Sequence, residues 1–267
     1  MDVNELYRLA KEWTLEAGTN LRQAVVQEVE VEYKTSAADL VTQKDKEIER
    51  FFSKKIKEAF PDHFLLGEEG VSEGQSAYDP QKETVWLVDP IDGTTNFVHN
   101  KRNFSISVGV YHEGEPLVGI IYDVMSDEMF HVLIGNGLYV NETRVEPLGE
   151  EKTYEQALIA MNHLWLAPND YLAEQPLQQM VQEIRGFRCI GSAALELAYV
   201  AVGRFEAAIF NGLGPWDFGA ASVLLQEQGV KFTTVSGDPV NVFKHSSVLT
   251  ATKTLHGTIQ SRYIELK

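Results

Sequence analysis

Acidic residues stand at three places where a short apolar run ends, and these are the residues of this chain that could carry chemistry. The run Phe64-Leu65-Leu66 leads into Gly67-Glu68-Glu69-Gly70, and Val85–Val88 leads into Asp89-Pro90-Ile91-Asp92. A third acid, Asp217, stands where a helix is predicted to begin. Carboxylates held where a buried strand emerges are rigid and partly desolvated, which suits hard cations such as Mg²⁺. They are costly there without a counter-charge, so the pattern favours a metal site.

Each acidic cluster also has an ordinary explanation when it is taken alone. Pro90-Ile91-Asp92-Gly93 is equally compatible with a β-turn, because Pro, Asp and Gly are common turn residues. Glu68-Glu69 fits a solvated loop, and Asp217 fits a helix N-cap. Asp45, three residues after Thr42, fits the acid of a capping box. It is the occurrence of all of these together that favours the metal site.

Several other catalytic patterns are absent from the sequence. There is no GxxxxGK[ST] phosphate loop, no HExxH helix and no GxSxG elbow. The Asp89 stretch is not a calcium-binding EF-hand loop, because Ile91 and Gly93 occupy ligand positions of that loop. The sole cysteine, Cys189, has no neighbours that would stabilise a thiolate, and we expect it to lie in the core.

Composition limits the partners and the compartment. Among 267 residues, 39 Asp and Glu outnumber 23 Lys and Arg, for a formal charge of −16, which repels nucleic acid. No run of about 18 apolar residues predicts a membrane span, and the start lacks the apolar stretch of a signal peptide. One cysteine fits a reducing cytoplasm. We therefore expect a cytoplasmic protein without nucleic-acid or membrane partners. The acidic composition is typical of a well-solvated surface, and if the substrate is anionic, the protein must hold cations between itself and that substrate.

The elements that must position these acids follow from hydrophobic periodicity. Helices are predicted from Asp2 and from Thr42, the second closed by Pro61. An antiparallel meander follows, with strands at Phe64–Leu66, Val85–Val88, Phe104–Tyr111, Leu117–Tyr122, Met129–Ile134 and Leu138–Val140. The second half alternates the strands Ala207–Phe210 and Val248–Thr252 with helices at 170–185, Ser192–Val202, Asp217–Gln228 and Leu255–Leu266. Because no linker composition appears, we expect one α+β domain over residues 1–267.

At the level of whole motifs, the chain resembles the inositol monophosphatase family. The stretch Asp89-Pro90-Ile91-Asp92-Gly93-Thr94-Thr95-Asn96 is similar to the signature of that family. The other landmarks occur in the family's order, namely Asp39-Leu40-Val41-Thr42 with Asp45, Gly67-Glu68-Glu69, Gly191-Ser192-Ala193 and Pro215-Trp216-Asp217-Phe218. The similarity extends from about residue 5 to about residue 255.

This resemblance implies a fold, an assembly and a cofactor. The fold is a layered αβαβα sandwich, related to that of fructose-1,6-bisphosphatase, and the assembly is a homodimer. The activity is a lithium-inhibited, Mg²⁺-dependent phosphatase. Glu68, Asp89 and the Ile91 carbonyl would hold a first Mg²⁺, and Asp89, Asp92 and Asp217 a second, with a weaker third ion that also contacts Glu68.

The resemblance also assigns roles around the metals. Glu68 and Thr94 would orient and deprotonate the attacking water, with Asp45 holding the Thr94 hydroxyl and Lys34 tuning the charge nearby. No covalent phospho-enzyme is expected, because the motif offers no nucleophile other than water. The residues expected to contact the substrate overlap with the metal ligands, and they are Ile91, Asp92, Gly93, Thr94, Gly191, Ser192, Ala193, Phe210 and Asp217.

Phe210 is the main departure from the family pattern. Inositol-specific members carry an acid at this position, and a phenyl ring cannot accept hydrogen bonds from substrate hydroxyls. The leading prediction is therefore a broad Mg²⁺-dependent phosphomonoesterase acting on inositol phosphates and related sugar or nucleotide phosphates. The alternatives are a phosphatase directed at NADP or adenosine 3′,5′-bisphosphate, and a non-catalytic regulatory protein that keeps the fold. Asn211 and Asn162 are the candidates to replace the missing acid.

Overall fold

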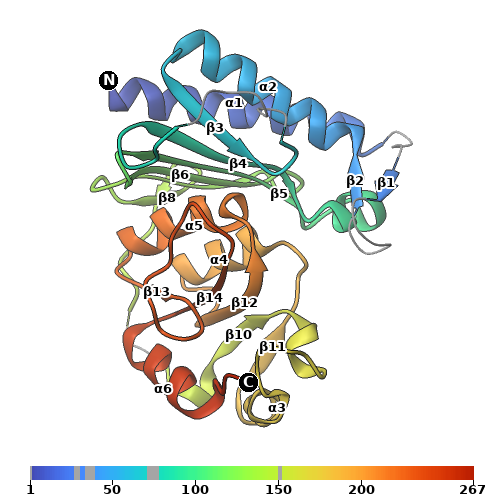
Figure 1. Ribbon diagram of the computed structural model, residues 1–267, viewed down its shortest axis with the longest axis vertical. Helices are drawn as coiled ribbons and strands as arrows, with labels where there is room; N and C mark the ends of the chain where they lie inside the picture. Colours follow the sequence, from blue (N-terminus) through green and yellow to red (C-terminus); the bar gives the residue numbers. More distant parts are fainter. Residues whose placement is uncertain (1, 27–30, 34–39, 71–77, 150–151) are drawn as a thin grey trace.

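The chain folds into five stacked layers, alternately helical and sheet-like. The computed structural model describes residues 2–26, 31–33, 40–70, 78–149 and 152–267. From one end to the other, the layers are a helix pair, a seven-stranded sheet, a second helix pair, a five-stranded sheet and a third helix pair (Figure 1). Three apolar cores fill the spaces on either side of the two sheets. The predicted αβαβα sandwich is therefore confirmed.

The first layer consists of α1 (Val3–Ala24) and α2 (Gln43–Ala59). Asp2 caps α1 by accepting hydrogen bonds from the backbone N–H groups of Asn4 and Glu5. Thr42 and Asp45 form the predicted capping box at the start of α2, which satisfies backbone donors that have no partner inside the helix. The buried faces of both helices pack on the first sheet. A small antiparallel pair, β1 (Val31–Tyr33) and β2 (Leu40–Thr42), lies outside the main sheets.

The seven-stranded sheet contains the predicted antiparallel meander from β4 to β8, but the prediction that the strand at Phe64–Leu66 is also antiparallel is wrong. Strands β4 to β9 pair with their neighbours antiparallel, whereas β3 and β4 run parallel. Parallel pairing brings the carboxyl ends of β3 and β4 to the same edge, with Gly67 opposite Val88. The strands are β3 (His63–Gly67), β4 (Thr84–Asp92), β5 (Ser105–His112), β6 (Glu115–Asp123), β7 (Glu128–Leu133), β8 (Leu138–Val140) and β9 (Thr143–Arg144).

The five-stranded sheet has the order β11-β10-β12-β14-β13. Its two predicted strands are present, and the three shorter strands were not foreseen. Each of those three has only three or four residues, which is too short for a periodicity to stand out. The strands are β10 (Leu158–Met161), β11 (Gly186–Arg188), β12 (Ala207–Leu213), β13 (Lys231–Thr233) and β14 (Ser246–Ala251).

The middle helices, α4 (Ala193–Ala201) and α5 (Pro215–Glu227), lie between the two sheets. Helix α5 sits very close to the first sheet because glycine lies beneath it. A Cβ atom added at Gly109 on β5 would lie 2.8 Å from the backbone nitrogen of Ala220, and one added at Gly119 on β6 would lie 2.5 Å from the Ala220 carbonyl oxygen. Side chains larger than hydrogen would therefore push α5 off the sheet.

The last layer contains α3 (Glu174–Glu183) and α6 (Lys253–Tyr263), both shorter than predicted. Three short helices complete the described chain: η1 (Asn96–Asn100), η2 (Tyr154–Gln156) and η3 (His163–Leu166). Within the described ranges, none of the helices combines the length and the apolar character that crossing a membrane requires.

Candidate active site

A β-bulge places two of the predicted carboxylates together at the end of β4. Asp89 pairs with Ser107 and Asp92 pairs with Ser105, so three steps along β4 match two steps along β5. In a regular strand, residues three apart point to opposite faces, and the bulge removes that alternation. Strand β4 therefore includes both acids, and the prediction that it ends at Val88 is wrong. The alternative that Pro90–Gly93 forms only a β-turn is also wrong. Pro90 is tolerated at the bulge because it has no N–H to donate to the ladder.

Helix α5 supplies the third carboxylate. Pro215 occupies the first helical position and Gly214 is the N-cap, so Asp217 stands in the first turn and not at the cap. Its Oδ2 accepts the Gly214 N–H at 2.7 Å. The Ser107 hydroxyl donates to the Trp216 carbonyl at 2.9 Å and ties the start of the helix to β5.

These three carboxylates converge on one point. One oxygen from each of Asp89, Asp92 and Asp217 lies within 4.8 Å of the other two. Asp89 is 1% exposed and Asp92 is 6% exposed. The first sheet and α5 therefore build a buried cluster of carboxylate oxygens, the donor type that Mg²⁺ prefers.

The pKa values of the cluster show why it needs a cation. Burial, together with the charges of Glu68, Asp92 and Asp217, raises the pKa of Asp89 well above its usual range. Burial and the charges of Asp92 and Glu68 do the same to the pKa of Asp217. Like charges in a low-dielectric site oppose one another's ionisation, and a bound cation relieves that repulsion. The carboxylate oxygens and their mutual repulsion thus fit a divalent cation. The charge of Glu68 contributes to the raised pKa of both Asp89 and Asp217.

Asp92 is held by the start of α4 and by one serine of β5. Its carboxylate accepts hydrogen bonds from the Ser105 hydroxyl at 3.2 Å, from the backbone N–H groups of Ala193 and Ala194 at 3.1 and 2.9 Å, and from the Ser192 hydroxyl. Burial raises the pKa of Asp92 to about 6 despite these hydrogen bonds. Ser192 and Ala193 were predicted as substrate contacts, which stays a prediction, and the structure shows that both donate hydrogen bonds to Asp92.

Thr94 is linked to Asp45 as predicted. The Thr94 hydroxyl lies 3.3 Å from Asp45 Oδ1 and 3.2 Å from the Ile91 carbonyl oxygen, which are its two possible acceptors. The other oxygen of Asp45 accepts from the backbone N–H and the hydroxyl of Thr42, at 2.8 and 2.5 Å. Burial raises the pKa of Asp45 to about 6. A chain of hydrogen bonds therefore runs from the start of α2 to the end of β4.

Glu49 is a residue of this region that the sequence reasoning missed. It is fully buried on α2, and its Oε2 accepts the backbone N–H of Glu69 at 2.6 Å. A Cβ atom at Gly67 would lie 2.4 Å from the Glu49 carboxyl carbon, so the glycine lets the loop rest on this side chain. The available signal was its position among the apolar residues Ile48 and Phe52 on the inward face of the helix.

The remaining predicted residues are placed as follows. Gly93 has a φ of +95°, and a Cβ atom there would lie 2.9 Å from the Gly191 carbonyl oxygen, so the two glycine loops touch. The side chain of Phe210 is only 6% exposed and belongs to the core between the sheets, which leaves little of its ring for a ligand. Its role in substrate binding stays a prediction. Lys34 and Asp39 lie outside the described residues. The prediction that Cys189 lies in the core is wrong, because it is exposed in the loop between β11 and α4.

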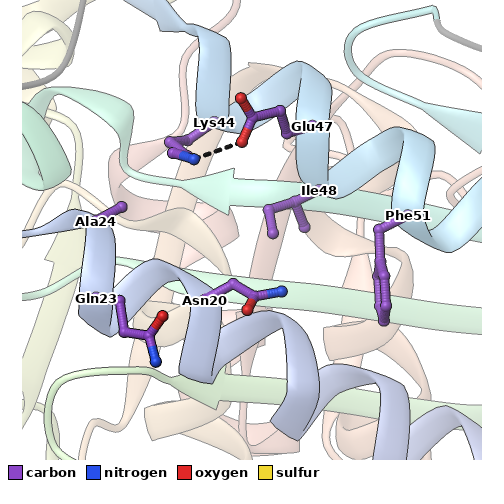
Figure 2. Close-up of a pocket in the computed structure, with 7 residues that line it drawn as sticks. All are labelled: Asn20, Gln23, Ala24, Lys44, Glu47, Ile48 and Phe51. Carbon is purple, nitrogen blue, oxygen red and sulfur yellow. Dashed lines mark hydrogen bonds and ion pairs between the residues drawn. The ribbon is translucent and has the colours of Figure 1, made fainter.

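A pocket of about 200 Å³ lies elsewhere, between α1 and α2 (Figure 2). On the α2 side of the pocket, Lys44 forms an ion pair with Glu47 of the same helix, with 2.5 Å between Nζ and Oε2. Its lining contains none of the clustered carboxylates: Asn20, Gln23, Ala24, Lys44, Glu47, Ile48 and Phe51. The chemistry of the chain therefore belongs to the acidic cluster and not to this pocket.

This layered α+β body, with a buried carboxylate cluster at the end of β4 and the start of α5, has the architecture and the donor groups of an enzyme that uses metal ions to hydrolyse phosphate esters. The sequence profile of the inositol monophosphatase family matches residues 2–265. The chain belongs to the inositol monophosphatase family, as its motifs indicated, and is a phosphoric monoester hydrolase.

Individual relatives support the assignment. The inositol-1-monophosphatase of Bacillus subtilis (strain 168) is 43% identical over 98% of both chains. The structure of inositol monophosphate-bound SaIMPase-II superposes with a TM-score of 0.85 at 36% identity, covering 97% of this chain and 93% of that one. A structure of an IMPase/NADP phosphatase with Mg²⁺ and phosphate gives a TM-score of 0.87 at 26% identity, covering 98% and 95% of the two chains.

The raised pKa values predict how the metal-free protein responds to pH. Asp45 and Asp92 have pKa values of about 6 in the folded protein, above the value of about 4 that applies to an unfolded chain. Between pH 4 and pH 6, the folded protein therefore binds more protons than the unfolded chain. The stability that these two groups contribute at pH 4 is lost as the pH rises to about 6. We expect the Tm in EDTA to fall by on the order of 5 °C across the window.

Thermal unfolding followed by circular dichroism at pH 4.5, 5.5 and 6.5 measures this effect. The matched series in saturating Mg²⁺ should show a smaller decrease, because the cation replaces the protons in neutralising the cluster. A Tm that stays constant or rises with pH in EDTA would contradict the prediction.

Proposed function

We propose that this chain hydrolyses inositol monophosphate and related small phosphate esters, using Mg²⁺ held by Glu68, Asp89, Asp92, Asp217 and the Ile91 carbonyl. The observation that carries the proposal is the convergence of Asp89, Asp92 and Asp217 within 4.8 Å in a buried site. Two ions, with a weaker third near Glu68, follow from the family resemblance. When bound, such ions neutralise phosphoryl oxygens, lower the pKa of a water molecule and stabilise the leaving alkoxide.

The residues of the chain would then position the reactants. Whether the Thr94 hydroxyl donates to Asp45 or to the Ile91 carbonyl, its oxygen can still accept a hydrogen bond from the attacking water. Glu68 would share that water and take up its proton. With the water fixed on one side of phosphorus and the leaving oxygen on the other, an in-line displacement needs little further rearrangement.

The phosphate would be received at the contact between the two glycine loops. Gly93 offers no side chain, so the backbone at Gly93 and Thr94 can approach the phosphoryl oxygens closely. Gly191 meets Gly93 from the α4 side, next to Ser192 and Ala193. The same residues that hold Asp92 would therefore border the phosphate.

The substrate range is proposed from the relatives and from Phe210. The B. subtilis relative bears the name inositol-1-monophosphatase, and the structural neighbour with bound Mg²⁺ is an IMPase/NADP phosphatase. Because Phe210 cannot accept hydrogen bonds, discrimination in favour of inositol would be weak. A nucleotide-directed activity, removing the 2′-phosphate of NADP or the 3′-phosphate of adenosine 3′,5′-bisphosphate, is the second candidate.

Phosphate release from a substrate panel tests the proposal. The panel consists of inositol 1-phosphate, fructose 1,6-bisphosphate, NADP and adenosine 3′,5′-bisphosphate, each with Mg²⁺, with EDTA and with Mg²⁺ plus Li⁺. We expect release that requires Mg²⁺, decreases with Li⁺ and has its highest kcat/KM for inositol 1-phosphate. A higher kcat/KM for a nucleotide would replace the leading substrate by the second candidate. Failure to release phosphate from any of them would favour a non-catalytic role.

The domain, the oligomeric state and the compartment of the protein are also part of the proposal. We propose that residues 1–267 act as one catalytic domain, that two copies form a homodimer and that the protein works in the cytoplasm. The family resemblance supports the dimer, and the single cysteine supports a reducing compartment. Light scattering coupled to size-exclusion chromatography would measure the assembly directly.

A further inference from the structure

Helix α4 carries one acidic residue, Glu196, in an otherwise apolar stretch. Glu196 is 2% exposed and is one of the few buried carboxylates outside the acidic cluster in the described part of the chain. It stands four residues after the N-cap Ser192, and its side chain turns back toward the loop that precedes the helix. A buried carboxylate is costly, so its contacts should explain why it is there.

One oxygen of Glu196 holds the backbone of that loop. Oε1 accepts the backbone N–H of Gly191 at 3.0 Å and also the N–H of Ile190. From the other side, the Asn96 amide donates to the Ile190 carbonyl oxygen at 2.9 Å. The Ile190–Gly191 segment is thus clamped between α4 and the helix that follows the Asp89–Thr94 motif.

The clamped segment leads directly to the groups that hold Asp92. Ser192, Ala193 and Ala194 follow Gly191, and all three donate hydrogen bonds to the Asp92 carboxylate. The Gly191 carbonyl oxygen also packs against Gly93. A displacement of Ile190 and Gly191 would therefore be passed to Asp92 through the chain itself.

We infer that Glu196 is a positioning residue, which sets the orientation of Asp92 and hence the affinity for Mg²⁺ by holding the Ile190–Gly191 backbone. The inference rests on the proposed function only in naming Mg²⁺ as the ligand. The other oxygen of Glu196, Oε2, is buried and has no hydrogen-bond partner among the described residues. The loop is therefore held through Oε1 alone, as an acceptor that a neutral amide oxygen can also supply.

This distinction determines the variants. Glu196→Gln keeps an acceptor oxygen of the same reach, whereas Glu196→Leu has similar size and removes it. Glu206→Leu is a matched control, because Glu206 is a buried carboxylate that accepts the Leu158 N–H at 2.6 Å. It lies just before β12, whereas Asp217 follows the opposite end of that strand.

The measurement is Mg²⁺ binding by isothermal titration calorimetry without substrate, followed by steady-state kinetics. We expect Glu196→Leu to raise the Kd for Mg²⁺ by about tenfold, the lower end of the effect of removing support from a metal ligand. Glu196→Gln should remain within about twofold of the wild type, on the grounds that the acceptor is retained. Glu206→Leu should lower the Tm and leave the Kd unchanged.

Two results would overturn the inference. One is wild-type Mg²⁺ affinity in Glu196→Leu, and the other is a loss in Glu196→Gln as large as in Glu196→Leu. Should Glu196→Leu not fold, Glu196→Asp takes its place: it keeps the charge but is too short to reach both N–H groups, so its Kd should also rise, and an unchanged Kd would count against us. If the wild type releases no phosphate from any ester, the proposed function fails while calorimetry still decides the role of Glu196.

Discussion

Replacing Asp92 by Asn should reduce Mg²⁺-dependent phosphate release by at least about a thousandfold, equivalent to about 4 kcal/mol of transition-state stabilisation. Asp92 is one of three carboxylates that converge within 4.8 Å, and it alone among them is held by the start of α4. An amide has no charge to offer a divalent cation. In the wild type, N–H and O–H donors point at the Asp92 carboxylate oxygens. The NH₂ group of the asparagine side chain cannot accept hydrogen bonds from them, so the variant also loses hydrogen bonds.

Asp123→Asn provides the matched control for this variant. Asp123 is 1% exposed, and its carboxylate accepts the backbone N–H and the hydroxyl of Ser126 in a turn after β6. It is not part of the acidic cluster, so Asp123→Asn should keep its activity. Phosphate release and Mg²⁺ calorimetry are compared for both variants after circular dichroism has verified folding. Retention of more than a tenth of wild-type activity by Asp92→Asn would remove Asp92 from the proposed metal site.

Adding one methyl group at Gly109 should damage both stability and activity, although Gly109 is not a site residue. The new Cβ atom would lie 2.8 Å from the backbone of Gly219 and Ala220 on α5. Backbone cannot rotate away as a side chain can, so α5 must shift, and overpacking of this kind costs about 1–3 kcal/mol. Because α5 carries Asp217 in its first turn, the shift also moves one cluster carboxylate.

Urea unfolding and phosphate release measure the two consequences of Gly109→Ala. We expect a loss of about 1–3 kcal/mol in the free energy of unfolding and a loss of activity of at least about tenfold, because small misplacements of catalytic groups are costly. Gly257→Ala is the control, since Gly257 lies in α6 and its added Cβ would meet no atom within 4 Å beyond its chain neighbours and the backbone of its own helix. It should be neutral or stabilising. A Gly109→Ala protein with wild-type stability would show that α5 does not depend on this close approach.

The sequence by itself determined the local features and the family. The capping box of Thr42 and Asp45, the meander from Val85 to Val140 and the amphipathic outer helices all depend on neighbours within a few residues, and all were predicted. The motif around Asp89 and Asp92, with Glu68 before it and Asp217 far after it, identified the metal-binding residue types. These are chemical properties of side chains and short segments, which remain the same whatever the rest of the chain does.

Only the tertiary structure decided how those residues meet. Asp89 and Asp92 share one side of β4 because of a bulge against β5, and Asp217 reaches them because glycines on β5 and β6 let α5 approach the sheet. In the sequence, Glu49 and Glu196 look like ordinary helix residues. The structure shows that each accepts hydrogen bonds from the backbone of a loop next to the acidic cluster. Convergence of this kind depends on strand register and on packing between segments distant in sequence. Neither is set by local propensity, so the sequence motifs indicated which residues share the site but not the bulge and the helix packing that bring them together.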